Sequence, residues 1–270
     1  MKIILTFLFF SFSVFVKAQL DVKIFAENNN NVIILYASNN EFCPISISLD
    51  LNLTNMVFTQ SQDKVLVIQE KTEKFKLGEL SILTRGEKYK YSYRSHYNIG
   101  DVNISSYDTT YEYGLPYSKG KRFLVFQGYN GSFSHQNENA IDFSMPEGTE
   151  ILAARDGVVI KVVDNNNESC PQQECVKYNN YITVYHSDGT FANYVHIKYN
   201  GSKVKVGDHI NKGELIASSG NTGWSSGPHL HFSCSLPGIE ERETIMTKFK
   251  INNGSKAEYL KEKETYLKDY

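Results

Sequence analysis

Hydrophobic and polar positions alternate in short runs over residues 21–94. The clearest run is 45–53, where Ile and Leu at odd-numbered positions alternate with Ser, Asp and Asn. A period of two buries one face of a sheet and exposes the other, so each run predicts a strand. Clusters of Asn, Gly and Lys separate the runs, with no helical period of 3.6 between them. Several strands at this spacing predict a small β-sandwich.

The alternation is lost over residues 97–120 and returns from Phe123 onwards. A junction between two domains is therefore expected in this stretch. In the second half, Asp156-Gly157 and Asp188-Gly189 are turn signals that favour β-hairpins. The polar run between them, residues 164–180, is typical of an insertion at the rim of a sheet.

These patterns predict an all-β protein with two domains. The first is a small β-sandwich-like domain with its connector, residues 19–120, and the second is an antiparallel β-sheet domain, residues 121–252. Residues 253–270 carry scattered Tyr and Leu among Lys and Glu. This composition favours a solvated tail, with a short surface helix as the alternative.

The N-terminal residues 1–18 have the features of a secretory signal peptide. Lys2 precedes an apolar run over residues 3–16, and Ala18 stands at a cleavage position. A retained membrane anchor is the alternative, although the run is short for a membrane span. The expected location is therefore secreted or periplasmic, in the cell envelope, with no stable membrane span after cleavage.

Charge and cysteine content narrow the range of partners. The net charge is -2, and no segment concentrates Lys and Arg, so nucleic acid is excluded as an expected partner. Four cysteines fit an oxidising compartment. Cys170 and Cys175 could close a short loop as a disulfide, whereas Cys43 and Cys234 either pair with each other or remain free buried thiols.

Two histidines, His229 and His231, lie two residues apart in a segment whose pattern predicts a strand. Alternate strand residues point to one side of a sheet, so both imidazoles should face one cleft. Two half-exposed histidines at a sheet edge are the alternative. His135, Asp142 and His196 add the side chains that a catalytic zinc needs, because such a site uses three protein ligands and leaves one position open.

Three segments of the second half carry a family resemblance, which covers roughly residues 123–232. They are AIDFSMPEGTEILAARDGVV, NYITVYHSDGTFANYVHI and VKVGDHINKGELIASSGNTGWSSGPHLHF. In this order they resemble the lysostaphin-type or LytM zinc endopeptidases, which cut peptide bonds in bacterial peptidoglycan. The resemblance implies a LytM-type antiparallel β-sheet domain of the duplicated hybrid kind, with a zinc ion (Zn2+) on the floor of its groove.

Carried over position by position, the resemblance makes Asp142 and His231 zinc ligands. It makes His196 and His229 the two catalytic histidines that do not bind the metal, one as general base and the other as a stabiliser of the oxyanion or a proton donor. The usual family pattern has a histidine four residues before the aspartate, where this chain has Glu138. We expect His135, three residues further back, to be the third ligand, with Glu138 as the competing choice.

The implied function is a zinc metalloendopeptidase acting on peptidoglycan stem peptides or cross-bridges. The alternative is a catalytically degenerate LytM-like protein that binds cell wall or regulates a partner hydrolase. A regulatory protein partner is a further expectation.

Tyr194 shares strand parity with His196, so it could line the same face of the sheet, although packing in the core is the favoured interpretation of this tyrosine. For the N-terminal β-domain we predict a role in positioning the groove or in covering it.

Overall fold

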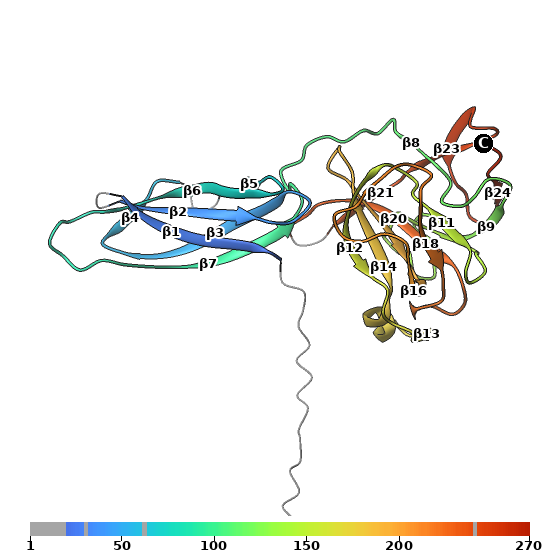
Figure 1. Cartoon of the computed structure of the whole chain (residues 1–270), viewed down its shortest axis with the longest axis horizontal. Helices are drawn as coiled ribbons and strands as arrows, with labels where there is room; N and C mark the ends of the chain where they lie inside the picture. Colours follow the sequence, from blue (N-terminus) through green and yellow to red (C-terminus); the bar gives the residue numbers. More distant parts are fainter. Residues whose placement is uncertain (1–19, 30–31, 61–63, 240–241) are drawn as a thin grey trace, which may run out of the picture.

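The computed structural model describes residues 20–29, 32–60, 64–239 and 242–270 (Figure 1). In this part of the chain the regular structure is almost entirely β, with one 3-10 helix, η1 (Gln173–Tyr178). The predicted all-β class is therefore confirmed. None of the helical structure in these ranges is both long and apolar enough to span a membrane. The predicted signal peptide lies outside the described residues.

Two sheets form the N-terminal part and enclose a hydrophobic cluster of their own, which includes Leu35, Ile47 and Leu80. Its members come from the alternating runs, so one face of each strand is buried, as the period of two predicts. The first sheet has the order β1 (Val22–Asn29), β2 (Val32–Asn39), β6 (Thr72–Ile82) and β4 (Met56–Phe58). The second has the order β5 (Leu66–Ile68), β3 (Ile45–Thr54) and β7 (Lys90–Ile99).

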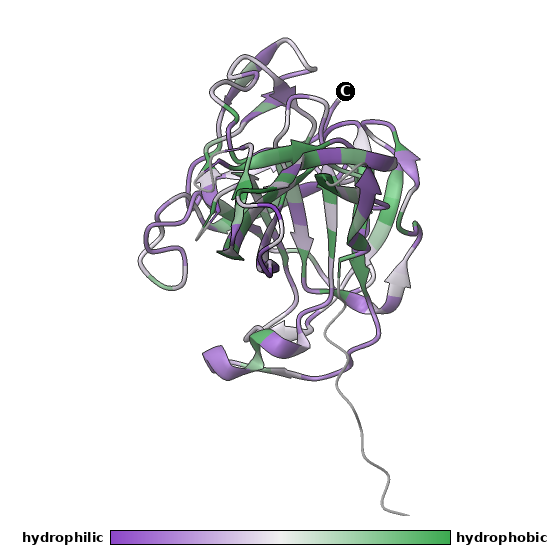
Figure 2. Ribbon diagram, turned by 90° about the vertical axis from the view of Figure 1, so that its left-hand side faces the viewer, coloured by the Kyte–Doolittle hydropathy of each residue, from purple (hydrophilic) through white to green (hydrophobic). Residues whose placement is uncertain are grey.

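One large sheet dominates the second half and packs over a separate hydrophobic cluster, which includes Phe143, Tyr194 and Phe232. In the described residues its strand order is β17 (His209–Ile210), β12 (Gly157–Val163), β14 (Tyr181–Tyr185), β15 (Phe191–Val195), β20 (Leu230–Leu236), β10 (Ala140–Phe143), β9 (Arg122–Gln127) and β24 (Thr265–Leu267), and β21 (Glu243–Ile245) pairs with β20. Figure 2 shows hydrophobic residues concentrated on strands and hydrophilic residues on many of the connecting loops.

Smaller sheets surround this large one. One has the order β11 (Glu150–Leu152), β18 (Leu215–Ser219) and β16 (Ile197–Ser202), and a parallel pair joins β13 (Ser169–Cys170) to β19 (Gly223–Trp224). A third has the order β23 (Lys256–Tyr259), β22 (Lys248–Ile251) and β8 (Glu112–Tyr113).

The C-terminal residues 253–270 are neither a solvated tail nor a surface helix, so both expectations for them are wrong. They form β23 and β24, and β24 pairs with β9. Leu260 and Tyr266 are buried in the large cluster. The scattered apolar residues are the ones that pack, and strands of three or four residues are too short to show a clear period.

One of the two predicted hairpins is present. Strands β14 and β15 pair across the Asp188-Gly189 turn, where Gly189 has φ +86°. The hairpin predicted at Asp156-Gly157 is wrong, because β11 pairs with β18 whereas β12 pairs with β14 and β17. A Cβ at Gly157 would lie 2.4 Å from the carbonyl oxygen of Tyr185, so glycine is needed there for close packing of two chain segments.

Candidate metal centre and active site

Four neighbouring strands place the central side chains of the site in one row across the large sheet. On β10 and β20, Asp142 stands directly opposite His231. The row continues to Gln127 on β9 and to Val195 on β15. Because cross-strand partners point to the same face, register alone brings the carboxylate and the imidazole together.

A loop between β9 and β10, the ligand loop (residues 128–139), delivers His135 to this row. Gln127 organises the loop, since its Oε1 accepts hydrogen bonds from the backbone N–H groups of Phe133 (3.2 Å) and Ser134 (3.0 Å). Its Nε2 donates to Asp142 Oδ2 at 3.0 Å. One glutamine therefore connects the aspartate to the loop that carries His135, whose side chain is only 1% exposed.

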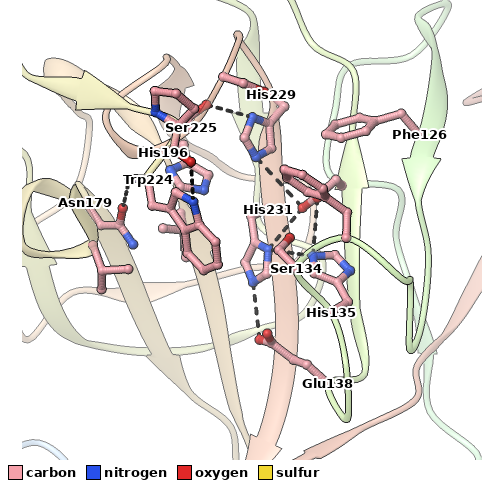
Figure 3. A pocket seen from close by; sticks show the side chains of 16 residues that line it. Phe126, Ser134, His135, Glu138, Asn179, His196, Trp224, Ser225, His229 and His231 are labelled. Atoms are coloured by element: carbon pink, nitrogen blue, oxygen red, sulfur yellow. Dashed lines mark hydrogen bonds and ion pairs between the residues drawn. The ribbon is translucent and has the colours of Figure 1, made fainter. Parts of the chain in front are cut away.

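Three residues bring potential ligand atoms together at this point (Figure 3). His135 Nε2 lies 3.2 Å from His231 Nδ1 and 3.2 Å from Asp142 Oδ2, and His231 Nδ1 lies 3.0 Å from Asp142 Oδ1. Zinc bonds of about 2.0 to 2.2 Å in a tetrahedron imply separations between ligand atoms of about 3.3 Å. The triangle of His135, Asp142 and His231 thus has the size that a zinc ion requires.

In His135 and in His231, the ring nitrogen that points away from the triangle also has a hydrogen-bond or ion-pair partner. His135 Nδ1 lies 3.0 Å from the carbonyl oxygen of Gly128, and this contact places the proton on Nδ1 and leaves Nε2 free as a ligand. His231 Nε2 lies 3.5 Å from Glu138 Oε1. A carbonyl or carboxylate on the outer nitrogen is the usual support of a histidine that binds metal. Glu138 contacts the far side of the His231 ring and does not belong to the converging triangle.

Electrostatics in the site favour a cation. Burial alone would raise the pKa of Asp142, but hydrogen bonds from His135 and His231 hold the pKa of this carboxyl well below its usual range. Burial alone would lower the pKa of His231, but its hydrogen bonds with Asp142 and Glu138 raise that pKa to about 10. Two carboxylates therefore stabilise positive charge here, and a cation that binds would take the place of the Nδ1 proton.

His196 and His229 lie beside the triangle, with their rings 4.4 Å apart between centroids. His196 Nδ1 lies 2.7 Å from the carbonyl oxygen of Thr222, and His229 Nδ1 lies 2.8 Å from that of Gly227. These contacts place a proton on each Nδ1 and leave each Nε2 as an acceptor. Burial, together with the charge of neighbouring histidines, lowers the pKa of His196 to about 3, and burial also lowers the pKa of His229. Both imidazoles are therefore neutral near pH 7.

A kink in the backbone turns His196 into the groove. Strand β15 ends at Val195, and His196 has φ 65°, which is unusual for a residue other than glycine. Strand alternation would put His196 on the same face as Tyr194, which is fully buried. The hydroxyl oxygen of Tyr194 accepts a hydrogen bond from the backbone N–H of Ala154 at 2.8 Å. The favoured interpretation of Tyr194 as a core residue is confirmed.

The five residues singled out from the sequence line one groove, together with Glu138. Phe126 stands on one side of the groove (Figure 3), and Phe133 of the ligand loop also lines it. The opposite wall comes from Pro171, Val176, Asn179 and Trp224. No described residue before Phe126 lines the groove, and the role of the N-terminal domain in positioning or covering it stays a prediction.

The polar insertion expected at the rim forms this second wall. A disulfide joins Cys170 to Cys175 within the disulfide loop (residues 168–179), as the spacing allowed. Cys43 and Cys234 are free buried thiols, so the alternative pairing between them is wrong.

The disulfide loop supports the glycine-rich loop (residues 220–229), whose carbonyl groups orient His196 and His229. Backbone N–H groups of Gly223 and Ser225 donate to the carbonyl oxygens of Glu168 (2.7 Å) and Cys170 (3.1 Å). The indole N–H of Trp224 donates to the Pro171 carbonyl oxygen at 3.1 Å. Both catalytic candidates therefore depend on contacts with the disulfide loop.

Replacing Cys170 and Cys175 together with serine should lower kcat/KM for a peptide substrate by about tenfold, because small displacements of catalytic groups are costly. Zinc content should not change, since the three candidate ligands lie on other segments. Treating the unaltered protein with a reductant should reproduce the loss, and the serine variant should not respond to it. Equal kcat/KM for the two proteins would contradict the supporting role.

Several residues of the site belong to no sequence motif or periodic pattern that would mark them as functional. Gln127, Thr222 and Trp224 are ordinary core or loop residues by pattern, and they act through hydrogen bonds that only the fold reveals. Within the glycine-rich stretch before His229, Trp224 and Ser225 line the groove. Strand register could have identified Gln127 only if β9 had been aligned with β10.

The fold and the site define an all-β protein with a candidate metallohydrolase centre. Residues 136–241 match Peptidase family M23, so the chain contains a domain of this family, and the resemblance to lysostaphin-type peptidases is confirmed. The matched range includes Asp142, His196, His229 and His231 and begins one residue after His135.

Several known proteins are similar to this part of the chain. An uncharacterized metalloprotease of Buchnera aphidicola is 39% identical over 92 residues, which are 34% of this chain and 21% of that protein. The peptidoglycan DD-endopeptidase ShyA of Vibrio cholerae is 34% identical over 102 residues, 37% of this chain and 20% of that protein. The chain thus spans about a fifth of the length of these relatives.

Solved structures with similarity include the catalytic domain of lysostaphin from Staphylococcus simulans. It is 25% identical, with a TM-score of 0.33, and the match covers 52% of this chain and 87% of that domain. Full-length lysostaphin of Staphylococcus simulans is 33% identical over 131 residues, 48% of this chain and 22% of that protein.

Glu138 should tune metal affinity without being a ligand. Replacing Glu138 with alanine is expected to weaken zinc binding by roughly 10- to 100-fold, the usual cost of losing the partner of a metal-binding histidine. A competitive chelator titration measures this change. The matched control is Glu147→Ala, because Glu147 pairs with Lys198 outside the groove. Unchanged affinity in Glu138→Ala would contradict the assignment, and total loss of zinc would make Glu138 a ligand.

Proposed function

We propose that the second half of the chain is a secreted or periplasmic zinc metalloendopeptidase that hydrolyses peptide bonds in bacterial peptidoglycan. In this proposal the peptidase domain comprises residues 121–252 together with β23 and β24. The observation that carries the proposal is the convergence of His135 Nε2, Asp142 Oδ1 and Oδ2, and His231 Nδ1 within one groove. The M23 match and the similarity to peptidoglycan DD-endopeptidase ShyA support the choice of substrate.

The zinc ion, when bound, would supply a nucleophile by acidifying water and would polarise the scissile carbonyl. His135, Asp142 and His231 would hold it. Both His196 and His229 are neutral and have an unprotonated Nε2, so either can accept a proton. After accepting a proton, the imidazolium can donate it to the leaving amine, as in general acid–base catalysis.

The surroundings of the two histidines keep them ready for proton transfer. Each Nδ1 is bound to a backbone carbonyl, so each ring has a fixed orientation and a fixed tautomer. Phe126 packs edge-on against the ring of His229, with centroids 5.3 Å apart, and excludes water from that side. In this arrangement one imidazole would take the proton of the attacking water at its Nε2, and the imidazolium so formed would stabilise the oxyanion or protonate the leaving amine. The second ring can act as donor only after it has received this proton at its own Nε2.

The test uses the full chain, purified with and without zinc. About one zinc ion per chain by elemental analysis, and release of peptide fragments from purified peptidoglycan, are the expected results. A zinc chelator should stop the release, and added zinc should restore it. A protein that binds no zinc and releases no fragments, yet sediments with peptidoglycan, would overturn the proposal in favour of a degenerate binding protein.

A further inference from the structure

The groove contains no basic side chain among the described residues that line it. Its charged lining residues, apart from the histidines, are Asp142 and Glu138. A bound zinc ion would balance these two carboxylates, which leaves the groove without net positive charge. A substrate carboxylate would therefore find no cation other than the metal itself to pair with.

The two lysines that adjoin lining residues are engaged elsewhere. Lys177 follows Val176, and its Nζ lies over the ring of Tyr178, 4.8 Å from the centroid. Lys198 lies close to His196 in sequence, and its Nζ lies 3.3 Å from Glu147 Oε1. Neither Lys177 nor Lys198 lines the groove. The walls thus offer no charged anchor for an acidic substrate.

Apolar side chains instead provide the exposed contact surface on both walls. Phe133 is 75% exposed and Phe126 is 41% exposed on one wall, and Val176 is 45% exposed on the other. Uncharged polar groups such as Asn179 and Ser226 complete the lining. Such walls can bind a substrate by burying apolar surface and by forming hydrogen bonds with its backbone. An uncharged peptide offers both apolar surface and backbone hydrogen-bonding groups.

We propose that the groove selects peptide segments that carry no carboxylate beside the scissile bond. This inference rests on the proposed function and deepens it by naming the substrate class. The enzyme would cleave an internal bond in an uncharged segment, and it would disfavour removal of a residue that bears a free C-terminal carboxylate. Repulsion by Glu138 and the lack of a compensating cation supply the discrimination.

Matched peptides test the selectivity. One pair differs by Gln against Glu at the position next to the scissile bond, and a second pair differs by a C-terminal amide against a free acid. We expect the uncharged member of each pair to have a kcat/KM about tenfold or more higher, because placing like charges together is costly. Equal kcat/KM within each pair would overturn the inference.

Binding provides a readout that does not depend on turnover. Trp224 is the only tryptophan in the sequence, and it lines the groove, so its fluorescence reports occupancy directly. We expect the zinc-loaded protein to bind the Glu and free-acid peptides about tenfold more weakly than their partners. This result without any cleavage would support the selectivity while overturning the hydrolase proposal. Equal affinities, or no binding of any peptide, would overturn the selectivity.

A charge added to the groove should abolish the preference. Ser226→Lys places a cation on the wall, and it should bring the Gln and Glu peptides to within about twofold of each other in Kd. The matched control is Gln60→Lys, which adds the same charge at an exposed position of the N-terminal part. Unchanged discrimination in Ser226→Lys would show that the lack of a cation is not its cause.

Discussion

Replacing His231 with alanine is expected to remove zinc from the protein and to lower peptidoglycan hydrolysis by about a thousandfold or more, since a catalytic metal lowers the barrier by several kcal/mol. His231 Nδ1 is within 3.2 Å of both other ligand atoms, so its loss leaves only two ligands. Elemental analysis and release of soluble fragments measure the two effects.

The matched control for this substitution is His209→Ala. His209 is exposed on β17 and does not line the groove, so its variant should keep both zinc and activity. Circular dichroism and thermal unfolding should show that both variants are folded. Retention of zinc together with full activity in His231→Ala would contradict the proposed centre.

Substituting alanine for His196 or His229 should lower activity without removing zinc, unlike the substitution of His231. Each change is expected to lower kcat by roughly 100- to 10,000-fold, the usual contribution of a general acid or base, while zinc remains bound. The reason is that neither imidazole belongs to the triangle of ligand atoms. Zinc content and single-turnover kinetics of each variant measure this separation.

The double variant shows whether the two histidines act as a unit. If one ring takes the proton and the other completes its transfer, removing both should cost little more than removing one. Multiplicative losses would mean that the two rings act independently. A single variant that retains the kcat of the unaltered protein would contradict a catalytic role for that histidine.

The all-β class could be predicted from the sequence because strands with one buried face leave a period of two. The run at 45–53 is β3, and its odd-numbered residues face the core of the N-terminal part. The C-terminal strands β23 and β24 were missed because each is only three or four residues long. Pairing with β9 stabilises β24, and sequence periodicity carries no information about that partner.

Part of the candidate site could also be predicted. His229 and His231 share a face by strand parity, and both line the groove. The position of His196 could not be derived in this way, because a residue with φ 65° breaks the alternation that parity assumes. The contact of Glu138 with His231 was equally hidden, since it depends on the path of the ligand loop.

The ligand loop places six residues between His135 and Asp142, whereas the family pattern described above places three. Doubling a flexible connection costs only about 0.6 kcal/mol in closure entropy. A ligand can therefore shift along the chain at little thermodynamic expense while strand register keeps Asp142 and His231 fixed. Motif searches that demand one spacing will discard competent metal centres of this kind, and sheet register is the safer criterion for recognising them.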